Sequence, residues 1–307
     1  MYYFRESEED DTACSCKLTI IGGEIMSVKL IIDSACDMPE DFIEEFNLEI
    51  IPFIINIGKK SYYDGEDITT PEVYEAMREG KDPTTDQVPA GKFQEVFKRE
   101  AEKGNDIIYL SFSSELSGTY QTGCMIAEQV QGDYPDVDIK VIDSKSGSAA
   151  TGIMAYRAAK MLRKGMGKEE VVNSLKNWIG NIEHLFYLNT LDALRRGGRI
   201  SRSKSFIGNF LSIKPLLTVV DGEIQLKEKV RGSKNALEKL VTLFENKCTN
   251  IPESLVAITH ADDLERAKEL KNKIEDLGGE IFCLELINSV LGVHLGIGGV
   301  GLFFLND

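Results

Sequence analysis

The feature that most constrains the fold is a recurring order, in which a short aliphatic run is followed by a helical pattern. Such runs occupy residues 28–34, 106–113 and 138–144, and helical patterns follow at 92–104 and 146–165. Parallel strands need a long connection between them, and that connection is most often a helix. The sequence therefore predicts an α/β fold built on a parallel, Rossmann-like sheet.

Hydroxyl side chains stand where these three strands are expected to end. Ser34 follows the first run, Ser144 follows the third, and the segment 111–121 after the second holds five serines or threonines together with Gly118. Ligands of open α/β sheets bind beyond the carboxyl ends of the strands. We therefore expect these hydroxyls to face one crevice.

The segment SSELSGTYQ (113–121) is compatible with a phosphate loop, a serine nucleophile, a carboxylate site or a helix cap. The motifs GxxxxGK[ST] and GxSxG, which would support the first two, are absent. Ser117 suits an N-cap, because a serine oxygen accepts a hydrogen bond from the first helical turn. The free amides of a helix start also attract anions, so a cap and an anion site are compatible. Both interpretations stay open.

The chain of 307 residues is long enough for two domains. The pattern of the sequence changes after about residue 186. The alternation of strand and helix ends there, and a hairpin signal at Asp221-Gly222 and a mixture of further elements follow. These further elements are helices at 233–247 and 262–277 and strands at 256–260, 280–287 and 299–305. We expect an N-terminal α/β domain over residues 26–187 and a C-terminal α+β domain over 188–307, with the ligand between them.

Residues 1–25 differ from the rest of the chain. They are acidic and lack the basic and apolar regions of a signal peptide, whereas Met26 stands directly before the first buried strand. We expect this leader to be disordered or an artefact of the assigned start, with Met26 as the natural first residue.

Charge and cysteine content exclude several classes of partner. A formal charge of −15 argues against nucleic acid or an anionic membrane surface. No apolar run approaches the roughly 18 residues of a membrane span, so stable membrane insertion is not expected. The cysteines are scattered without a paired framework, which indicates reduced thiols and a cytoplasmic location.

The three histidines lack metal-ligand spacing, so no metal site is predicted. His184 and His260 lie at the ends of elements, where structural roles are more common. His294 lies in an apolar, glycine-rich stretch and is equally compatible with a structural role and with ligand contact. The string GIGGVG (296–301) matches a dinucleotide fingerprint, yet no helix can follow it, so we interpret these glycines as close packing.

Two polar segments and one proline carry further predictions. Residues 81–91 are expected to form a polar loop in which Thr85 or Asp86 caps the helix that begins near Gly91. Pro52 predicts an edge or a bend within 48–58. The stretch LRRGGRISRSK (194–204) is a positive patch in an acidic chain, which suits either a solvated turn or the binding of a partner or a phosphorylated ligand.

Several motifs together resemble the DegV family of bacterial fatty-acid-binding proteins. They are IIDSACDMP (31–39), PTTDQVPAGKF (83–93), SSELSGTYQ (113–121), LRRGGRIS (194–201), IKPLL (213–217) and LGVHLGIGGVG (291–301). Their order and spacing match from about Val28 to the C-terminus, so that only the leader lies outside the resemblance.

The resemblance implies a non-enzymatic carrier that buries one long-chain fatty acid and needs no cofactor. Carried onto this chain, the carboxylate is held by Thr85 and Ser117 with the Gly118 amide, and His294 lies near it. Arg199, and more loosely Arg231, match basic positions for kinase docking or phosphate contact. The implied partner is a separate ATP-dependent fatty-acid kinase that makes an acyl phosphate.

One position departs from the family pattern. The family usually has Thr-Ser-Gln where this chain has Thr85, Asp86 and Gln87. A carboxylate at 86 would repel a bound fatty-acid head group unless Asp86 turns outward. The alternative interpretation is an enzyme, a subunit related to small-molecule kinases that uses His294 and Ser117, because the second domain of the family is similar to a domain of dihydroxyacetone kinases.

Overall fold

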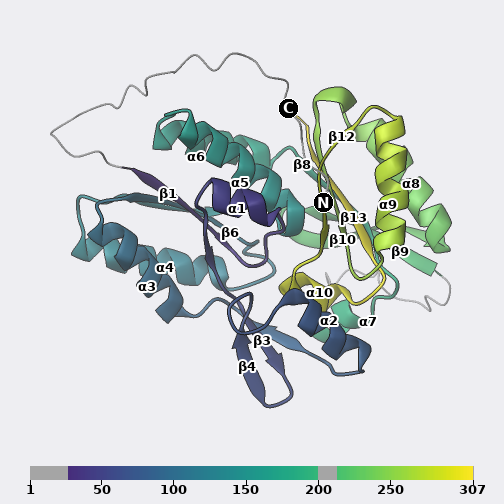
Figure 1. Ribbon diagram of the computed structural model, residues 1–307, viewed down its shortest axis with the longest axis horizontal. Helices are drawn as coiled ribbons and strands as arrows, with labels where there is room; N and C mark the ends of the chain where they lie inside the picture. The colour runs from purple at the N-terminus through teal and green to yellow at the C-terminus, as the bar shows by residue number, and fades with distance from the viewer. Residues whose placement is uncertain (1–26, 200–212, 307) are drawn as a thin grey trace.

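A computed structural model describes residues 27–199 and 213–306. The expected leader, residues Cys14 and Cys16, the start at Met26 and the 200–204 part of the basic stretch lie outside the described residues. The described chain forms two sheets, with helices between and around them, and a small third sheet that projects from one end (Figure 1).

The N-terminal sheet is parallel throughout, which confirms the predicted fold class. Its strand order is β2-β1-β6-β7, with β2 at one edge and β7 at the other. The strands are β1 (Val28–Asp33), β2 (Glu49–Ile51), β6 (Asp106–Ser111) and β7 (Ile139–Asp143). Side chains of successive residues point to opposite faces. Ile31 thus packs toward one helical layer, and Leu30 and Ile32 toward the other.

The helices cover both faces of this sheet. On one face lie α3 (Ala90–Glu102) and α4 (Thr119–Asp133), and on the other α1 (Glu40–Glu45), α5 (Ser148–Arg163) and α6 (Lys168–Ile179) (Figure 1). The helical pattern predicted at 92–104 is confirmed by α3, which buries Phe93, Val96 and Phe97. Helix α2 (Thr70–Arg78) begins with Thr69 and Glu72 in a reciprocal capping box.

The segment 81–91 is not the simple polar loop that its composition predicts. Residues Thr84–Asp86 form β5, which pairs antiparallel with β3 (Ile54–Ile57), and β3 pairs with β4 (Lys60–Tyr63). Helix α3 then starts after Pro89 without a side-chain cap, so the expected cap by Thr85 or Asp86 is wrong. Both residues belong to a strand instead. The bend expected at Pro52 is confirmed, because it separates β2 from β3.

The C-terminal sheet is mixed, with strand order β10-β9-β8-β13-β11-β12. The pair β11–β12 is parallel and the other pairs are antiparallel. Its strands are β8 (Ile182–Tyr187), β9 (Ile213–Val220), β10 (Glu223–Arg231), β11 (Leu255–His260), β12 (Glu280–Leu286) and β13 (Val300–Leu305). The predicted hairpin is confirmed, with positive φ at both Asp221 (51°) and Gly222 (88°), as a tight two-residue turn requires.

Further elements surround this sheet. Helices α8 (Ser233–Lys247) and α9 (Leu264–Asp276) cover its outer face, where they enclose a core of their own. The short α7 (Asp192–Gly197), η2 (Ile251–Glu253) and α10 (Ser289–Leu295) lie in the connections. Strand β8 pairs within the C-terminal sheet, so the chain passes from one sheet to the other before β8. The predicted domain boundary between residues 187 and 188 stays a prediction.

Helix α5 joins the two halves. It is buried over most of its length and packs between the N-terminal sheet and strands β11 and β13 of the other (Figure 1). Its small residues allow this close packing. A Cβ on Gly152 would stand 2.1 Å from the backbone oxygen of Asp37, so no larger residue fits there without a shift of the chain.

A buried carboxylate ties the start of α5 to the start of α10. Asp37 accepts hydrogen bonds from Ser148 Oγ at 2.5 Å, Asn288 N at 2.8 Å and Asn288 Nδ2 at 3.0 Å. Asn288 in turn caps α10, since its side chain accepts from Leu291 N. Burial raises the pKa of the Asp37 carboxyl to about 7, although these three donors lower it.

We predict that Asp37→Asn changes how stability depends on pH. A carboxyl whose pKa is raised on folding contributes stability at low pH that is lost as pH rises through the folded pKa. The free energy of unfolding of the wild type should therefore fall, relative to that of the variant, between about pH 4 and pH 7. Urea unfolding at several pH values measures this difference. The same substitution at exposed Asp136 is the control, and an equal pH profile for wild type and Asp37→Asn would refute the assignment.

Candidate functional site

The loop that follows β6 is positioned by the buried Asp33. This carboxylate accepts hydrogen bonds from Tyr109 Oη and Phe112 N, both at 2.7 Å, and from Ala35 N at 3.2 Å. Burial raises the pKa of the Asp33 carboxyl to about 6. The geometry of these bonds directs residues 112–118 across the carboxyl end of the sheet.

Ser117 and Gly118 lie at the start of α4. The cap position is Gly118 rather than Ser117, and it has no side-chain cap bond. Ser117 Oγ instead accepts weakly from Thr119 N at 3.3 Å and shares a hydrogen bond with Thr119 Oγ1 at 2.9 Å. The expected N-cap is therefore displaced by one residue, because the hydroxyl satisfies the first helical amide from just outside the helix.

Gly118 permits a close approach by Gln87. A Cβ at position 118 would stand 2.3 Å from Gln87 Oε1, and the Gln87 amide donates to Thr122 Oγ1 at 2.8 Å. The β5 segment and the N-terminus of α4 are thereby held side by side. This contact brings Thr85 to the same opening as Ser117.

His294 and Thr85 share a hydrogen bond. Thr85 Oγ1 and His294 Nε2 are 2.7 Å apart, which joins β5 to α10 across 209 positions of the chain. The other ring edge lies against α7, where a Cβ on Gly197 would stand 2.2 Å from His294 Nδ1. Burial, with a smaller effect of the Arg199 charge, lowers the pKa of the His294 imidazole to about 4. His294 is therefore neutral at neutral pH.

Arg199 stands at the rim of this opening. Its guanidinium donates to the backbone oxygens of Leu116 at 3.2 Å and Gly197 at 2.7 Å, while the side chain stays exposed. Thr85, Gln87, Ser117, Arg199 and His294 supply the polar lining of a recess of about 410 Å³, which we call the polar recess. Neutral hydroxyls, an imidazole and one guanidinium from four different segments thus converge on one point.

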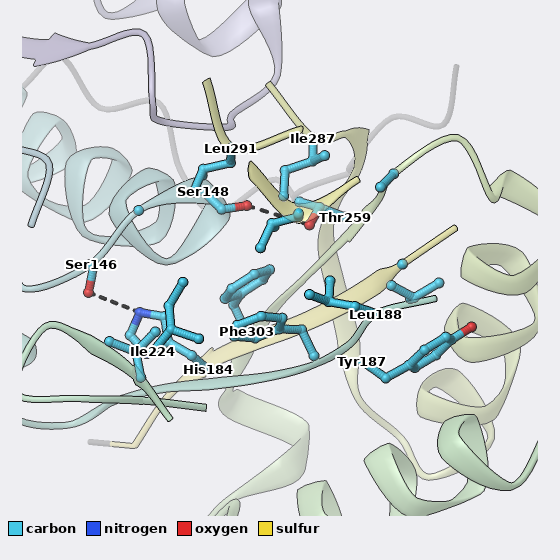
Figure 2. A pocket seen from close by; sticks show the side chains of 18 of the residues that line it. Ser146, Ser148, His184, Tyr187, Leu188, Ile224, Thr259, Ile287, Leu291 and Phe303 are labelled. Carbon is cyan, nitrogen blue, oxygen red and sulfur yellow. Dashed lines mark hydrogen bonds between the residues drawn. The ribbon is translucent and has the colours of Figure 1, made fainter. Parts of the chain in front are cut away.

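A second and larger cavity lies behind the polar recess. It comprises about 580 Å³ of space between atoms, part of it open to solvent, and we call it the apolar cavity (Figure 2). The two spaces adjoin, because they share five apolar lining residues: Phe112, Leu116, Ile224, Leu291 and Leu295. The combined space has a polar end and an almost wholly hydrocarbon remainder, and it lies between the two sheets.

Four polar side chains in the wall of the apolar cavity are bonded in pairs. Figure 2 shows His184 and Ser146, whose Nε2 and Oγ atoms are 3.0 Å apart, and Ser148 beside Thr259, with oxygens 3.5 Å apart. Ser148 also donates to Asp37. Because these atoms satisfy each other, the surface left to a ligand is mainly carbon.

The comparisons with known proteins agree with this architecture. A family model described as "Uncharacterised protein, DegV family" matches residues 27–307. The chain belongs to the DegV family. A DegV domain-containing protein of Clostridium perfringens is 36% identical over 282 residues, which cover 91% of this chain and 97% of the relative. A second, from Caldanaerobacter subterraneus, is also 36% identical over 282 residues, covering 90% and 98%.

Solved structures of other DegV proteins have the same fold. A Thermus thermophilus family member described for its fatty-acid binding is similar at a TM-score of 0.84 with 28% identity, covering 92% of this chain and 100% of its own. A Thermotoga maritima protein, described as revealing fatty-acid binding function, reaches 0.80 with 28% identity and covers 92% and 100%. A stearic-acid-binding protein of Eubacterium ventriosum reaches 0.82 with 26% identity, covering 91% and 98%.

The strand-end hydroxyls of this DegV chain do not face one crevice as expected. Ser111 and Ser144 are fully buried, and their hydroxyls donate to the backbone oxygens of Phe112 and Ser146. Ser34 Oγ accepts from Phe53 N. These three hydroxyls shape the turns, and residues one to six positions after Ser111 and Ser144 line the two spaces.

Three of the remaining predicted residues lie outside the lining of both spaces, whereas the glycine run contributes Gly299 and Gly301 to the wall of the apolar cavity. Arg231 ends β10, opposite Ile213, and is not part of the lining of either space. Asp86 points outward and accepts from Asn56 Nδ2 at 2.8 Å, so it turns away but caps no helix. His260 accepts from Asp263 N at 3.3 Å, which is the structural role expected of it. The glycine run is close-packed as expected, since a Cβ on Gly299 would stand 2.9 Å from a backbone oxygen.

The sequence reasoning missed His184 as a cavity residue. Its interpretation as a structural histidine is correct in that it is buried and bonded to Ser146, yet it also lines the apolar cavity. The available signal was its place in an apolar stretch in which Phe186 and Leu188 follow at alternate positions, although β8 itself ends at Tyr187. Alternation along the strand puts these three residues on one face.

Metal ligands and membrane-spanning helices are not found in the described part of the chain. Within residues 27–199 and 213–306, no cluster of three metal-ligating side chains occurs. In the same ranges no helix is both long and apolar enough to cross a bilayer. The described cysteines, Cys36, Cys124, Cys248 and Cys283, are free thiols.

We predict that His294 stays neutral to well below its ordinary pKa. In ligand-free protein its imidazole NMR signal should titrate with a midpoint of about 4 rather than 6.5, because burial disfavours the charged ring. Histidine pKa values lowered on folding also mean that stability declines as pH falls from about 6.5 toward 4. His294→Gln identifies the signal. A midpoint near 6.5 that vanishes in this variant would contradict the prediction.

Proposed function

We propose that this protein binds one long-chain fatty acid, with its carboxylate in the polar recess and its tail in the apolar cavity. The observation that carries the proposal is that the polar recess and the apolar cavity adjoin along five shared apolar residues. A ligand that fills both must be polar at one end and long and apolar elsewhere. Three solved relatives described as fatty-acid binders support the same ligand class.

The polar recess suits a carboxylate held mostly by neutral donors. The hydroxyls of Thr85 and Ser117 lie at the opening, the N-terminus of α4 beside Gly118 supplies amide dipoles, and a neutral His294 donates from one ring nitrogen. Asp86 turns outward, so its charge does not oppose the head group. Such a site fixes the position of a carboxylate without a tight ion pair, which leaves the oxygen nucleophilic.

The tail supplies most of the affinity. Burial of a methylene is worth about 0.8 kcal/mol, so an acyl chain of roughly sixteen carbons contributes on the order of 10 kcal/mol before the cost of association. A hydrogen bond to a charged group adds about 1.5–3 kcal/mol. Head-group contacts therefore determine the position of the fatty acid more than the affinity with which it binds.

We further propose that the protein is a carrier in the cytoplasm that presents its fatty acid to a separate ATP-dependent kinase. The exposed Arg199 at the rim of the polar recess supports this, because a guanidinium there can meet a phosphoryl group or a docking partner. Arg231 is proposed as a second docking residue, at the end of β10 and outside the lining. The carboxylate would lie at the end of the buried ligand that is nearest to this rim.

Lipid analysis tests the ligand class directly. Purified protein is denatured, extracted and examined by mass spectrometry, and close to one fatty acid per chain is expected. Protein that carries no lipid and binds none after incubation with palmitate, while acting on a polar substrate, would instead favour the kinase-related enzyme.

We predict that Thr85→Ala combined with Ser117→Ala loosens the head group more than it weakens binding. Fatty-acid affinity should fall by roughly a hundredfold, which corresponds to two hydrogen bonds of about 1.5 kcal/mol each to the charged carboxylate, while the tail contacts remain. Acyl-phosphate formation with a family kinase, trapped with hydroxylamine, should fall much more because the carboxylate loses its register. Ser114→Ala in the same loop, whose hydroxyl accepts from Lys145, is the control. Unchanged acyl-phosphate formation in the double variant would show that the role is misassigned.

We predict that Arg199→Ala separates binding from presentation. The affinity for palmitate should change less than about threefold, because the guanidinium bonds to backbone oxygens at the rim and the tail is unaffected. Kinase-dependent acyl-phosphate formation should fall by about tenfold or more, since a charge-assisted contact to phosphate or partner is lost. Arg196→Ala, on an exposed arginine 3.4 Å from Asp82, is the matched control. Equal losses of acyl-phosphate formation in both variants would indicate that overall positive charge, rather than Arg199 itself, supports the reaction.

A further inference from the structure

Strand β13 of the C-terminal sheet has a glycine, Gly301, at one position that faces the apolar cavity. Gly301 of β13 lies opposite Phe186 of β8 and opposite Thr259 of β11. Directly opposite residues of antiparallel strands point to the same face of a sheet. All three line the apolar cavity, so Gly301 is a gap between two side chains in its wall.

Phe303 lies two residues further on the same face and covers this gap. A Cβ on Gly301 would stand 2.8 Å from Cε2 and 2.9 Å from Cζ of the Phe303 ring, and 3.1 Å from Thr259 Oγ1. Real Cβ atoms essentially never come this close to ring atoms, so the ring and a side chain at 301 exclude each other. The ring rests where that side chain would be.

The ring is bounded on its other side by His184, the residue opposite Phe303 in β8. Their ring centroids are 5.9 Å apart in an edge-to-face arrangement, and His184 is fixed by its bond to Ser146 (Figure 2). If the Phe303 ring is displaced from Gly301, it therefore moves into the apolar cavity. The volume available to a ligand depends on how far Phe303 can lie back onto the glycine.

We infer that Gly301 and Phe303 together set the largest acyl chain that the apolar cavity accepts. This rests on the proposed function and adds a selectivity that no head-group residue can supply. Gly301 makes room for the Phe303 ring in the wall, and the ring in turn limits the room left for methylenes. Changes at the two positions should have opposite effects on chain-length preference.

Competition among fatty acids tests the inference. Delipidated wild-type and variant proteins are incubated with an equimolar mixture of myristate, palmitate, stearate and arachidate, and the bound acids are extracted and quantified. Gly301→Ala should lower the ratio of stearate to myristate bound by about tenfold, which corresponds to about two methylenes left unburied. Phe303→Leu should raise the proportion of stearate and arachidate.

The double variant and a neighbouring position provide the controls. Leucine lacks the ring atoms that an alanine methyl at position 301 would meet, so Gly301→Ala with Phe303→Leu should return toward the wild-type ranking. Phe304→Leu makes the same change on the opposite face of β13, where Phe304 packs on Phe244, and should leave the ranking unchanged.

Each outcome decides a separate question. If the wild type binds fatty acid and all variants keep its ranking, the inference is overturned while the proposed function stands. If the wild type binds no fatty acid, the proposed function itself fails. If Gly301→Ala does not fold, the comparison of Phe303→Leu with Phe304→Leu decides, because only the former should shift the ranking.

Discussion

The packing of α5 between two sheets is the interaction on which the rest of the structure depends. This helix fills the space between the N-terminal sheet and β11 and β13 with alanines, glycine and a few larger side chains. Gly147, just before the helix, and Ser148, its first residue, line the apolar cavity. Before the first residue of α5 the space between the sheets is not filled by this helix, and that space is the candidate ligand site.

The Asp37 carboxylate fixes this arrangement at its edge. It holds the first residue of α5 and the cap of α10, and α10 carries His294 to the polar recess. A buried carboxylate with neutral donors and a raised pKa is a weak contributor to stability. Asp37 matters chiefly for positioning, because one group fixes two helices that approach the candidate site from different halves of the chain.

Much of the fold follows from patterns within the chain. Buried strands at 28–33 and 106–111, the helix over 233–247 and the hairpin at Asp221-Gly222 each carry a local signal, either aliphatic runs, amphipathic spacing or turn chemistry. The strand β5 carries no such signal. Its Thr84–Asp86 is polar, and it becomes a strand because β3 offers it an edge to pair with. Tertiary pairing overrides local propensity there.

The candidate site, too, was predictable from the sequence only in part. Thr85, Ser117 and His294 were predicted by resemblance to a family, and the structure brings them to one recess although the resemblance alone could not give their contacts. The tail wall was not predictable, because it is assembled from single residues of many elements, such as Phe186, Thr259 and Phe303. Their shared face depends on strand pairing, which the sequence pattern does not specify.

Hydrogen bonds between residues that are far apart in the chain have a consequence for folding. Asp37 and Asn288 are 251 positions apart, and Ser113 donates to the backbone oxygen of Gly222 across 109 positions. Contacts of this range form only after large loops have closed, so they appear late and slowly. During synthesis the N-terminal sheet and the Ser117 loop can form while the opposite wall has yet to be made. A nascent chain thus has the Thr85 and Ser117 segments before it has His294 or the cavity wall from β13, so both spaces are complete only in the finished molecule.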